Sequence, residues 1–459
     1  MTEEMGMARD LGLILPDIIV VLTAVIALCA GMLRRHDLAL PLTLVGLFVA
    51  TALTIPLIGK NTVTFSGTYR VDDLSIWSKL ILLPATGLTA ILAATEVRGT
   101  DREATVYSLL SFATVGALAL SGAGDVMFLV LGVLLTSLAS FALVAYPRTD
   151  VATEAAMKYF VFGAVSGSVM TFGLTYWFGA TGSTLIADLD RLASMRLAAV
   201  AGLVGVLVGL GFKAGLTPFH FWVPDAYDGG PLSVAAYLSV VPKVGAVFAL
   251  AEVARNLPPD IANWPIGVAG LAVASMVYGN LAALPQTNVV RLLAYSSIAQ
   301  SGYLIFGVAA IGRSDLAVRS LVVFAAAYAA MNIGMFGVIA VVGRNLSDFA
   351  GIGRARPWLG AATVIFLLSL VGIPPLAGFI GKLLLFGAAI DAQFTWLAVI
   401  GILNSVLSLA VYLRIIVPMY QSPQAAPVPG RMATTVLVAS VILTIGIGLA
   451  AQILTERIR

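Results

Sequence analysis

The chain has 459 residues, of which 60% are hydrophobic and 11% are charged, and its mean hydropathy is +1.01. Soluble globular proteins carry about 45–50% apolar and about 25% charged residues, so this composition indicates a membrane protein. The formal net charge of +3 gives no reason to expect a nucleic-acid partner. The single cysteine, Cys29, excludes a Cys-ligated iron–sulfur cluster, a cysteine zinc site or an internal disulfide, and we expect no cofactor or metal in this chain.

Apolar segments of about 20 residues, each long enough to cross about 30 Å of hydrocarbon, recur along almost the whole chain. Hydropathy predicts fourteen spans, near residues 11–33, 38–58, 74–94, 104–122, 125–146, 154–178, 198–216, 232–252, 262–282, 289–310, 316–342, 358–388, 394–418 and 432–453. We therefore expect an all-α polytopic membrane protein with short loops, because a β-barrel would show short alternating segments instead. The N-terminus has no signal-peptide cleavage pattern, so we expect the first span to remain as an anchor.

Basic residues in loops usually mark the cytoplasmic side. With fourteen spans, ten lie on one side: Arg34, Arg35, Arg98, Arg102, Arg148, Arg291, Arg344, Arg354, Arg356 and Arg431. Ten lie on the other: Arg9, Lys60, Arg70, Arg191, Arg196, Arg255, Arg313, Arg319, Arg457 and Arg459. The charge bias therefore predicts no orientation.

Two of the spans are expected to be discontinuous. The seventh runs into Pro218 soon after Lys213, and the twelfth contains S-L-V-G-I-P-P-L-A-G-F-I-G-K, which ends at Lys382. Each combines a proline break with a lysine, and they lie five spans apart. Interrupted spans in corresponding positions are typical of transporter folds built from two inverted repeats.

The lysines have an unusual distribution. Six of the 26 basic residues are lysine, and five of these six fall within apolar spans: Lys79, Lys158, Lys213, Lys243 and Lys382. Lysine changes its protonation state readily when it loses water, whereas arginine stays protonated. This partition indicates a proton relay, which simple anchoring would not require.

Each lysine also has a structural interpretation. Lys79 lies near a span start, and we interpret it as structural, with its ammonium group at headgroup level. Lys158 is also near a span start and can pair with Glu154 one turn before it, so both roles remain open. For Lys213 and Lys243 we expect a function, because a charge at mid-membrane costs at least ~2.5–3.5 kcal/mol on insertion scales. We assign Lys382, which follows the second break, to the relay as well.

The proline breaks suggest how such charges are tolerated. Freed carbonyl groups at membrane depth survive only against protein or internal water, and either can solvate an ammonium group. His220, just past the first break, is a candidate proton acceptor, since the pKa of free histidine lies near neutrality, or else a structural histidine. A metal site is disfavoured because the chain has only two histidines, His36 being in the first loop.

Four long motifs resemble the antiporter-like membrane subunits of respiratory complex I. They are K-A-G-L-T-P-F-H-F-W-V-P-D-A-Y-D-G-G-P (213–231), V-V-R-L-L-A-Y-S-S-I-A-Q-S-G-Y (289–303), E-A-A-M-K-Y-F-V-F-G-A (154–164) and G-I-P-P-L-A-G-F-I-G-K (372–382). Within this family the chain is most similar to subunit N of proton-translocating NADH-quinone oxidoreductase. The E-A-A-x-K-Y-F segment and the lysine at the end of the twelfth-span motif favour that branch.

The resemblance implies fourteen helices with two inverted five-helix repeats at residues 104–252 and 262–418, between N-terminal helices (1–103) and a C-terminal helix (419–459). It implies a bacterial plasma-membrane location with both termini periplasmic. It implies partners among the other membrane-arm subunits, further antiporter-like subunits included, and it implies that the iron–sulfur clusters, FMN and quinone belong to partner subunits. It also implies roles: Lys213 as the central lysine, Lys243 as the connecting lysine, His220 on the path and Lys382 in the exit half-channel.

One position departs from the family pattern. Members usually read G-x-E-L-x-S-L in the fifth span, and the glutamate pairs with the central lysine. Here the segment is G-V-L-L-T-S-L, and the aligned residue is Leu134. An ion pair at ~4 Å and an effective dielectric constant near 20 is worth about 4 kcal/mol, so its absence changes how Lys213 can be controlled. Glu154 is the candidate substitute partner.

Three functions remain open from the sequence. The first is proton translocation by a membrane-arm subunit, with protons entering near His220, passing Lys243 and Lys213, and leaving towards Lys382. The second is a subunit of a multisubunit cation/proton antiporter. The third is a structural subunit whose channel has decayed, which the leucine at position 134 motivates. The sequence does not distinguish protons from sodium, or identify the electron donor and the quinone.

Overall fold

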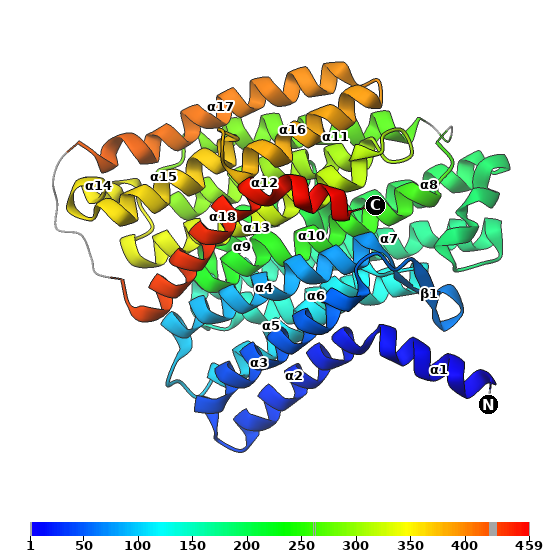
Figure 1. Ribbon diagram of the computed structural model, residues 1–459, viewed down its shortest axis with the longest axis horizontal. Coiled ribbons are helices and arrows are strands. Elements are labelled where there is room, and N and C mark those ends of the chain that lie inside the picture. The colour runs from blue at the N-terminus through cyan, green and yellow to red at the C-terminus, as the bar shows by residue number, and fades with distance from the viewer. Residues whose placement is uncertain (1, 260, 262, 422–428, 459) are drawn as a thin grey trace.

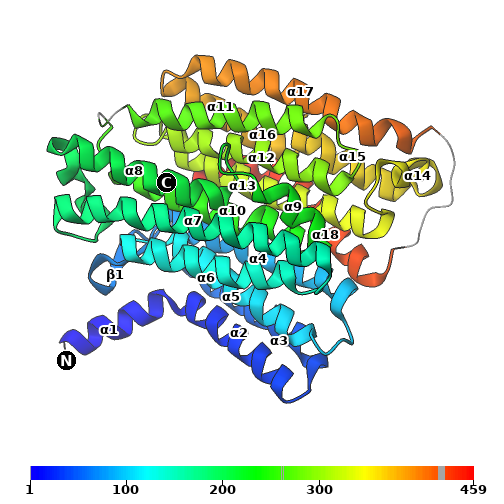
Figure 2. The same ribbon diagram turned by 180° about the vertical axis from the view of Figure 1, so that it is seen from behind.

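The computed structural model describes residues 2–259, 261, 263–421 and 429–458, and the side chains from residue 7 onwards. The helices run side by side in one bundle, with α2 and α3 at one edge and α17 at the opposite edge (Figures 1 and 2). Among the described residues, thirteen helices are long and apolar enough to cross a membrane. The expected span 358–388 is divided into two shorter helices, α15 (Pro357–Val371) and α16 (Ala377–Asp391), and the predicted all-α architecture is confirmed.

The helices before the first break are α1 (Thr2–Leu13), α2 (Leu15–Met32), α3 (Ala39–Thr54), α4 (Asp73–Val97), α5 (Glu103–Ser121), α6 (Val126–Ala145), α7 (Asp150–Thr181) and α8 (Arg196–Ala214). Those after it are α9 (Trp222–Gly229), α10 (Leu232–Asn256), α11 (Trp264–Ala283), α12 (Val289–Ala309), α13 (Leu316–Val342), α14 (Ile352–Ala355), α15 (Pro357–Val371), α16 (Ala377–Asp391), α17 (Thr395–Met419) and α18 (Arg431–Arg457). Short 3-10 turns occupy His36–Leu38, Ile55–Leu57, Phe65–Gly67, Ile186–Ser194 and Leu346–Phe349.

The N-terminal region differs from the prediction in two respects. The expected span 11–33 is divided into α1 and α2, which bend apart around Ile14, just before Pro16 in the first turn of α2 (Figure 1). The expected loop 59–73 contains an antiparallel hairpin of β1 (Thr62–Thr64) and β2 (Tyr69–Val71). We call the membrane surface that carries this hairpin the hairpin face. The proline-rich segment 422–428 lies outside the described residues.

Both predicted breaks are present and share one geometry. Helix α8 ends at Gly215 and α15 ends at Gly372, and each glycine adopts a left-handed backbone conformation, with φ +69° and +95°. Glycine terminates helices in this way because it has no Cβ to clash with the following carbonyl. A Cβ at Gly215 would lie 3.0 Å from Lys243 Nζ, and one at Gly372 would lie 3.0 Å from Lys382 Cδ. Each break therefore brings main chain into contact with a buried lysine.

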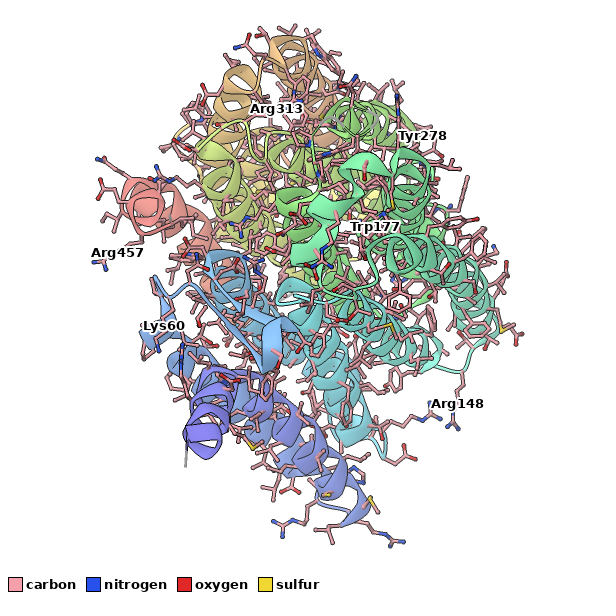
Figure 3. All side chains as sticks on the ribbon, turned by 90° about the vertical axis from the view of Figure 1, so that its right-hand side faces the viewer. Lys60, Arg148, Trp177, Tyr278, Arg313 and Arg457 are labelled. Atoms are coloured by element: carbon pink, nitrogen blue, oxygen red, sulfur yellow. The ribbon has the colours of Figure 1, made fainter. Side chains whose placement is uncertain are left out.

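Helices α10, α12 and α13 form the centre of the bundle, since nearly all of their residues are buried. The start of α10 is capped by Glu96 of α4, whose carboxylate accepts hydrogen bonds from the backbone N–H groups of Leu232 and Ser233. Looking along the helices, Figure 3 shows the bundle in cross-section, with α1 and α2 at its lower edge. Outer helices expose large apolar side chains, as expected of surfaces that face lipid or another membrane protein.

Candidate functional site

Lys213 lies in the last turn of α8, and its side chain is fully buried. Its ammonium nitrogen donates hydrogen bonds to Ser137 Oγ on α6 at 3.0 Å and to Tyr159 OH on α7 at 3.1 Å. The ring of Tyr159 stacks on Trp222 of α9, with 4.3 Å between centroids. Trp222 in turn donates its indole N–H to the carbonyl of Phe212 at the end of α8. The break thus positions Lys213 against neutral hydroxyl groups.

A lateral cavity of about 640 Å³ between α6 and α7 adjoins this lysine. Its lining includes Ser137, which accepts from Lys213, and Leu134 one helical turn earlier. The Leu134 side chain is 50% exposed. Helical spacing therefore places position 134 on the same face as the serine that contacts Lys213, as expected if the family glutamate aligns with Leu134.

Lys243 lies in the middle of α10 and is also fully buried. Its nitrogen donates to Ser297 Oγ on α12 at 2.5 Å. The same hydroxyl group makes hydrogen bonds with Tyr227 of α9 at 3.2 Å and Tyr328 of α13 at 3.1 Å. Ser297 is therefore a hub that joins α9, α10, α12 and α13 at one point.

Lys382 lies on α16, directly after the second break. Its nitrogen donates to the carbonyl oxygens of Leu370 and Val371, both at 2.9 Å, and to Ser405 Oγ at 3.2 Å. The ammonium group also sits 4.0 Å from the ring centroid of Tyr303, a cation–π distance. Freed carbonyl groups at the end of α15 thus solvate the charge, as predicted for the breaks. At Lys213 side-chain hydroxyls take this role instead.

Polar contacts connect the region of Lys243 to Lys382. Ser296, beside Ser297, shares a hydrogen bond with Tyr412 at 2.5 Å. Gln300 then contacts both Tyr412 OH at 3.4 Å and the Leu370 carbonyl at 3.2 Å, and Lys382 donates to the same carbonyl. The contacts therefore link the region of Lys243 to Lys382. Among the described residues, Lys213 makes its hydrogen bonds to Ser137 and Tyr159 and none to Lys243, so the order of the lysines along a path stays a prediction.

His220 lies between α8 and α9 and is buried. Its ring lies 4.4 Å from the ring of Tyr278 and 4.7 Å from that of Phe221. Its Nδ1 atom has no hydrogen-bond partner among the described residues. The structure therefore places a buried imidazole with a free ring nitrogen beside the first break, and it does not join His220 to the lysines by direct hydrogen bonds in the described part of the chain.

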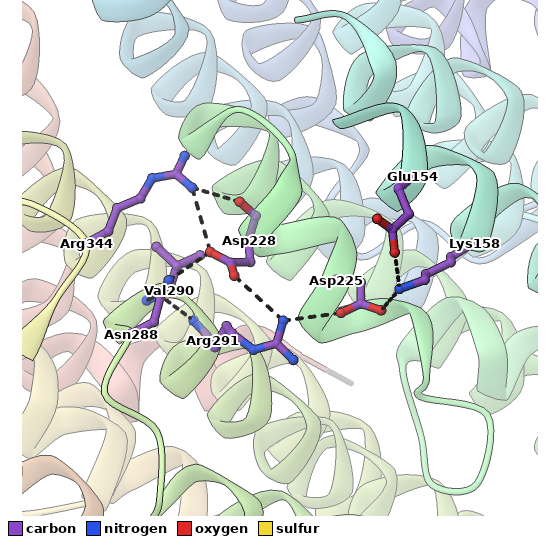
Figure 4. A network of polar contacts seen from close by, with 8 residues as sticks. All are labelled: Glu154, Lys158, Asp225, Asp228, Asn288, Val290, Arg291 and Arg344. Atoms are coloured by element: carbon purple, nitrogen blue, oxygen red, sulfur yellow. Dashed lines mark hydrogen bonds and ion pairs between the residues drawn. The ribbon is translucent and has the colours of Figure 1, made fainter. Parts of the chain in front are cut away.

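A surface ion network links the two halves of the chain on the face opposite the hairpin (Figure 4). Lys158 pairs with Glu154 at 2.8 Å, as predicted, and also with Asp225 at 3.1 Å. Asp225 is bridged by Arg291 to Asp228, and Asp228 lies near Arg344. The network joins α7 and α9 to α12 and the segment after α13.

Glu154 does not replace the missing glutamate. Its side chain is 69% exposed, and its described partner is Lys158. No acid lies within ion-pair distance of Lys213, Lys243 or Lys382 among the described residues, where the only lysine ion pairs are those of Lys79 and Lys158. The three central ammonium groups are therefore held by neutral acceptors.

The interpretation of Lys79 as a headgroup-level lysine is wrong. Its side chain is fully buried, and its nitrogen lies 2.6 Å from a carboxylate oxygen of Asp17 on α2. The hairpin and the N-terminal helices cover the position that headgroups would otherwise reach. A position near the end of a span does not indicate exposure, because a neighbouring helix can cover the side chain.

Sequence reasoning also missed the hydroxyl groups around the lysines. Those in direct contact with an ammonium group are Ser137, Tyr159, Ser297 and Ser405. Serine is common in membrane helices, so none stood out alone. One signal was available, since the Y-S-S-I-A-Q-S-G-Y motif places Ser296, Ser297 and Gln300 in the centre of the bundle.

No group of three or more histidine, cysteine or acidic side chains that could hold a metal occurs in the part of the chain that the structure describes.

Broken helices that place lysines at the centre of a helical bundle define the class of antiporter-like membrane subunits. Residues 123–408 match the family model described as NADH:quinone oxidoreductase/Mrp antiporter, transmembrane. The chain resembles a chain of respiratory complex I from Thermus thermophilus with a TM-score of 0.84 and 31% identity, over 96% of this chain and 98% of that one. It shares its fold with a chain of the Mrp complex from Dietzia sp., with a TM-score of 0.85 at 21% identity.

Curated relatives narrow the assignment. The chain is 39% identical to NADH-quinone oxidoreductase subunit N 1 of Streptomyces griseus over 469 aligned positions, covering 98% of both chains. It is 39% identical to subunit N of Mycobacterium sp. (strain JLS), covering 87% of this chain and 88% of that one. The chain belongs to the family of NADH-quinone oxidoreductase subunit N.

Proposed function

We propose that this chain is a proton-translocating membrane-arm subunit of a respiratory complex I in a bacterial plasma membrane. Quinone reduction in partner subunits, which would hold the FMN, the iron–sulfur clusters and the quinone site, drives the translocation. One observation carries the proposal: the ammonium groups of Lys213, Lys243 and Lys382 are buried at the two breaks and between them, on neutral acceptors. Such groups can lose and regain a proton, whereas buried arginines could not.

The proposed path crosses the first break and then follows the polar contacts from Lys243 to Lys382. Protons are exchanged between Lys213 and Lys243 across the first break, where Gly215 leaves room for Lys243. They continue through the hydroxyl groups around Ser297 and through Gln300 to Lys382. His220, with its free ring nitrogen, is the proposed exchange site between this path and the membrane surface. The proposed repeats, residues 104–252 and 262–418, each supply one broken helix, and the path crosses between them.

The leucine at position 134 cannot form the ion pair that a glutamate would form with the Lys213 ammonium group. In the proposed mechanism Ser137 and Tyr159 take over from the family glutamate and hold the Lys213 ammonium by hydrogen bonds alone. These acceptors carry no charge, so they stabilise the ammonium form without the attraction between opposite charges that an ion pair supplies. Release of the proton from Lys213 then requires no separation of an ion pair.

The test uses the assembled complex in sealed vesicles, with quinone reduction and proton uptake followed together. Lys213→Ala and Lys382→Ala are expected to lower proton uptake, with assembly intact. Arg35→Ala, at an exposed basic residue in the loop after α2, is the control and is expected to leave uptake unchanged. If both central variants pump as many protons per quinone as the unmodified complex, the chain does not translocate protons through these lysines.

The remaining alternatives have separate tests. A cation/proton antiporter complex would contain no iron. Iron in the purified complex would therefore exclude this alternative, and its absence would support it. A structural subunit with a decayed channel predicts that lysine variants stay fully active while Leu134→Glu abolishes assembly.

A further inference from the structure

A buried ion pair lies outside both proposed repeats and outside the proposed lysine path. Lys79 Nζ on α4 lies 2.6 Å from Asp17 Oδ2 on α2, and Tyr69 of strand β2 donates its hydroxyl to Asp17 Oδ1 at 3.0 Å. The Lys79 side chain is fully buried and that of Asp17 is 17% exposed. Residues 123–408 are the part matched by the family model, so this pair belongs to the N-terminal helices that precede the match.

The lysine of this pair is under-satisfied. An ammonium group has three donors, and apart from the Asp17 contact Lys79 Nζ has no hydrogen-bond partner among the described residues. The ring of Tyr69 lies 5.2 Å from the nitrogen. A purely structural pair of charges in this position would be expected to satisfy its remaining donors, because burying them unpaired is costly.

A charged cavity lies on the hairpin face, near the start of the helix that carries Lys79. Its volume is about 420 Å³, and its lining includes the charged side chains Lys60, Arg70, Asp72 and Arg255. Below it Glu252, 2% exposed, pairs with Arg70 at 2.9 Å and with Arg255 at 3.3 Å. Asp72 pairs with Arg255 at 2.7 Å and caps the start of α4. Exchangeable protons and charge are therefore available within two helical turns of Lys79.

The pair also has an inward neighbour. Asp72, Lys79 and Thr86 are spaced seven residues apart and so share one face of α4, about 10 Å apart at 1.5 Å per residue. Thr86 shares a hydrogen bond with Thr114 of α5 at 2.9 Å, and Thr114 shares one with Tyr237 of α10 at 3.1 Å. Helix α10 is the helix that carries Lys243. This face of α4 thus runs from the charged cavity to the centre of the bundle.

From this arrangement we propose that Asp17 and Lys79 form an additional proton-exchange site between the hairpin face and the row Thr86–Thr114–Tyr237. The proton moves from Lys79 Nζ to Asp17 Oδ2, which converts the ammonium and carboxylate into a neutral amine and a neutral acid. Asp17 then releases the proton towards the charged cavity and the amine takes up the next proton from the interior, which restores the ion pair. The site rests on the proposed function for its driving force.

The test separates exchange from structural support. Asp17→Asn or Lys79→Met alone leaves one buried charge unpaired and can prevent assembly. The informative variant is therefore the neutral pair Asp17→Leu with Lys79→Met, since apolar residues of similar volume often replace a buried ion pair without loss of stability. We expect the assembled double variant to reduce quinone but to take up fewer protons per quinone. A reversed pair, Asp17→Lys with Lys79→Asp, is expected to recover uptake. Unchanged uptake in the neutral pair would overturn the proposal.

A second readout does not depend on pumping. Infrared difference spectra during turnover are expected to show a protonated carboxyl band that is absent in the neutral pair and present in Lys213→Ala. If Lys213→Ala pumps normally while this band persists, the proposed function fails and the exchange site stands. If turnover produces no band that depends on Asp17, the exchange site fails independently of the fate of Lys213.

Discussion

At the scale of single residues, this protein holds its central lysines with neutral groups. Lys213 rests on two hydroxyls, Lys243 on the Ser297 hydroxyl, and Lys382 on two freed carbonyls and a hydroxyl. Neutral acceptors stabilise an ammonium group less strongly than a carboxylate would, yet they still allow it to exist inside the bundle. The residues that accept hydrogen bonds from each ammonium group therefore determine, together with the lysines, how strongly the charge is stabilised.

Ser297→Ala removes the one described hydrogen-bond acceptor of Lys243. Because a hydrogen bond to a charged group contributes about 1.5–3 kcal/mol and about 1.4 kcal/mol is a factor of ten in rate, we expect proton translocation to fall roughly 10–150-fold. Proton uptake and quinone reduction in sealed vesicles measure this. The matched control is Ser320→Ala, a buried serine whose hydroxyl donates only to its own helix at Ala317. Equal effects of the two variants would show that Ser297 has no special role.

At the scale of elements, the two broken helices are the main positioning devices. Each ends in a left-handed glycine whose missing Cβ leaves room for a lysine of another segment. The sequence predicted the breaks from proline but not this use of glycine, because the contact between Gly215 and Lys243 joins residues 28 positions apart.

Gly215→Ala tests that contact. The new Cβ would lie 2.9 Å from Val223 and 3.0 Å from Lys243 Nζ, so we expect lower stability by about 1 kcal/mol from backbone strain and a further loss of translocation from the displaced ammonium. Gly182→Ala is the control, since Gly182 has φ +68° and nothing lies within 4 Å of its added Cβ. Thermal melting of the complex should report the strain in both variants, and proton uptake should fall in Gly215→Ala alone. Normal uptake in Gly215→Ala would contradict the contact's role.

The ion network in Figure 4 supports α9 at the membrane surface. Asp225→Asn removes its pairs with Lys158 and Arg291, both partly exposed. Exposed pairs contribute little individually, so we expect a modest loss of local stability, seen as roughly 2–30-fold faster hydrogen exchange in the peptide 217–230 of the assembled complex. Glu154→Gln removes one more exposed pair and should change exchange less than twofold. Similar exchange in both variants would mean that Asp225 does not anchor α9.

At the scale of the whole molecule, the distribution of basic residues between the loops does not predict the orientation of the chain in the membrane. The fold nevertheless makes the two membrane surfaces easy to distinguish. Lys60 and Arg457 lie towards the viewer on the hairpin face in Figure 3, whereas Arg148 belongs to the loop between α6 and α7 on the opposite face. We propose from the family resemblance that the hairpin face is periplasmic.

Cysteine labelling tests this orientation. In a Cys29→Ser background, Lys60→Cys and Arg457→Cys should react with a membrane-impermeant thiol reagent in intact cells, because both positions are exposed on the hairpin face, which we propose to be periplasmic. Arg148→Cys should react only after the membrane is opened. The reverse pattern would invert the topology and with it the direction of the proposed path.

Composition and hydropathy predicted a polytopic helical membrane protein, and the prolines and lysines inside apolar segments predicted both breaks and the burial of Lys213, Lys243 and Lys382. These features can be read from the sequence because membrane burial demands long apolar helices, and because a lysine or a double proline inside one is conspicuous. The burial of Lys79 and the contacts of each lysine follow from the tertiary structure alone. Lys213 meets Ser137 across 76 positions and Lys243 meets Ser297 across 54, and Lys79 meets Asp17 from another helix. Such partners are set by helix–helix packing, which brings together residues whose separation along the chain carries no local pattern.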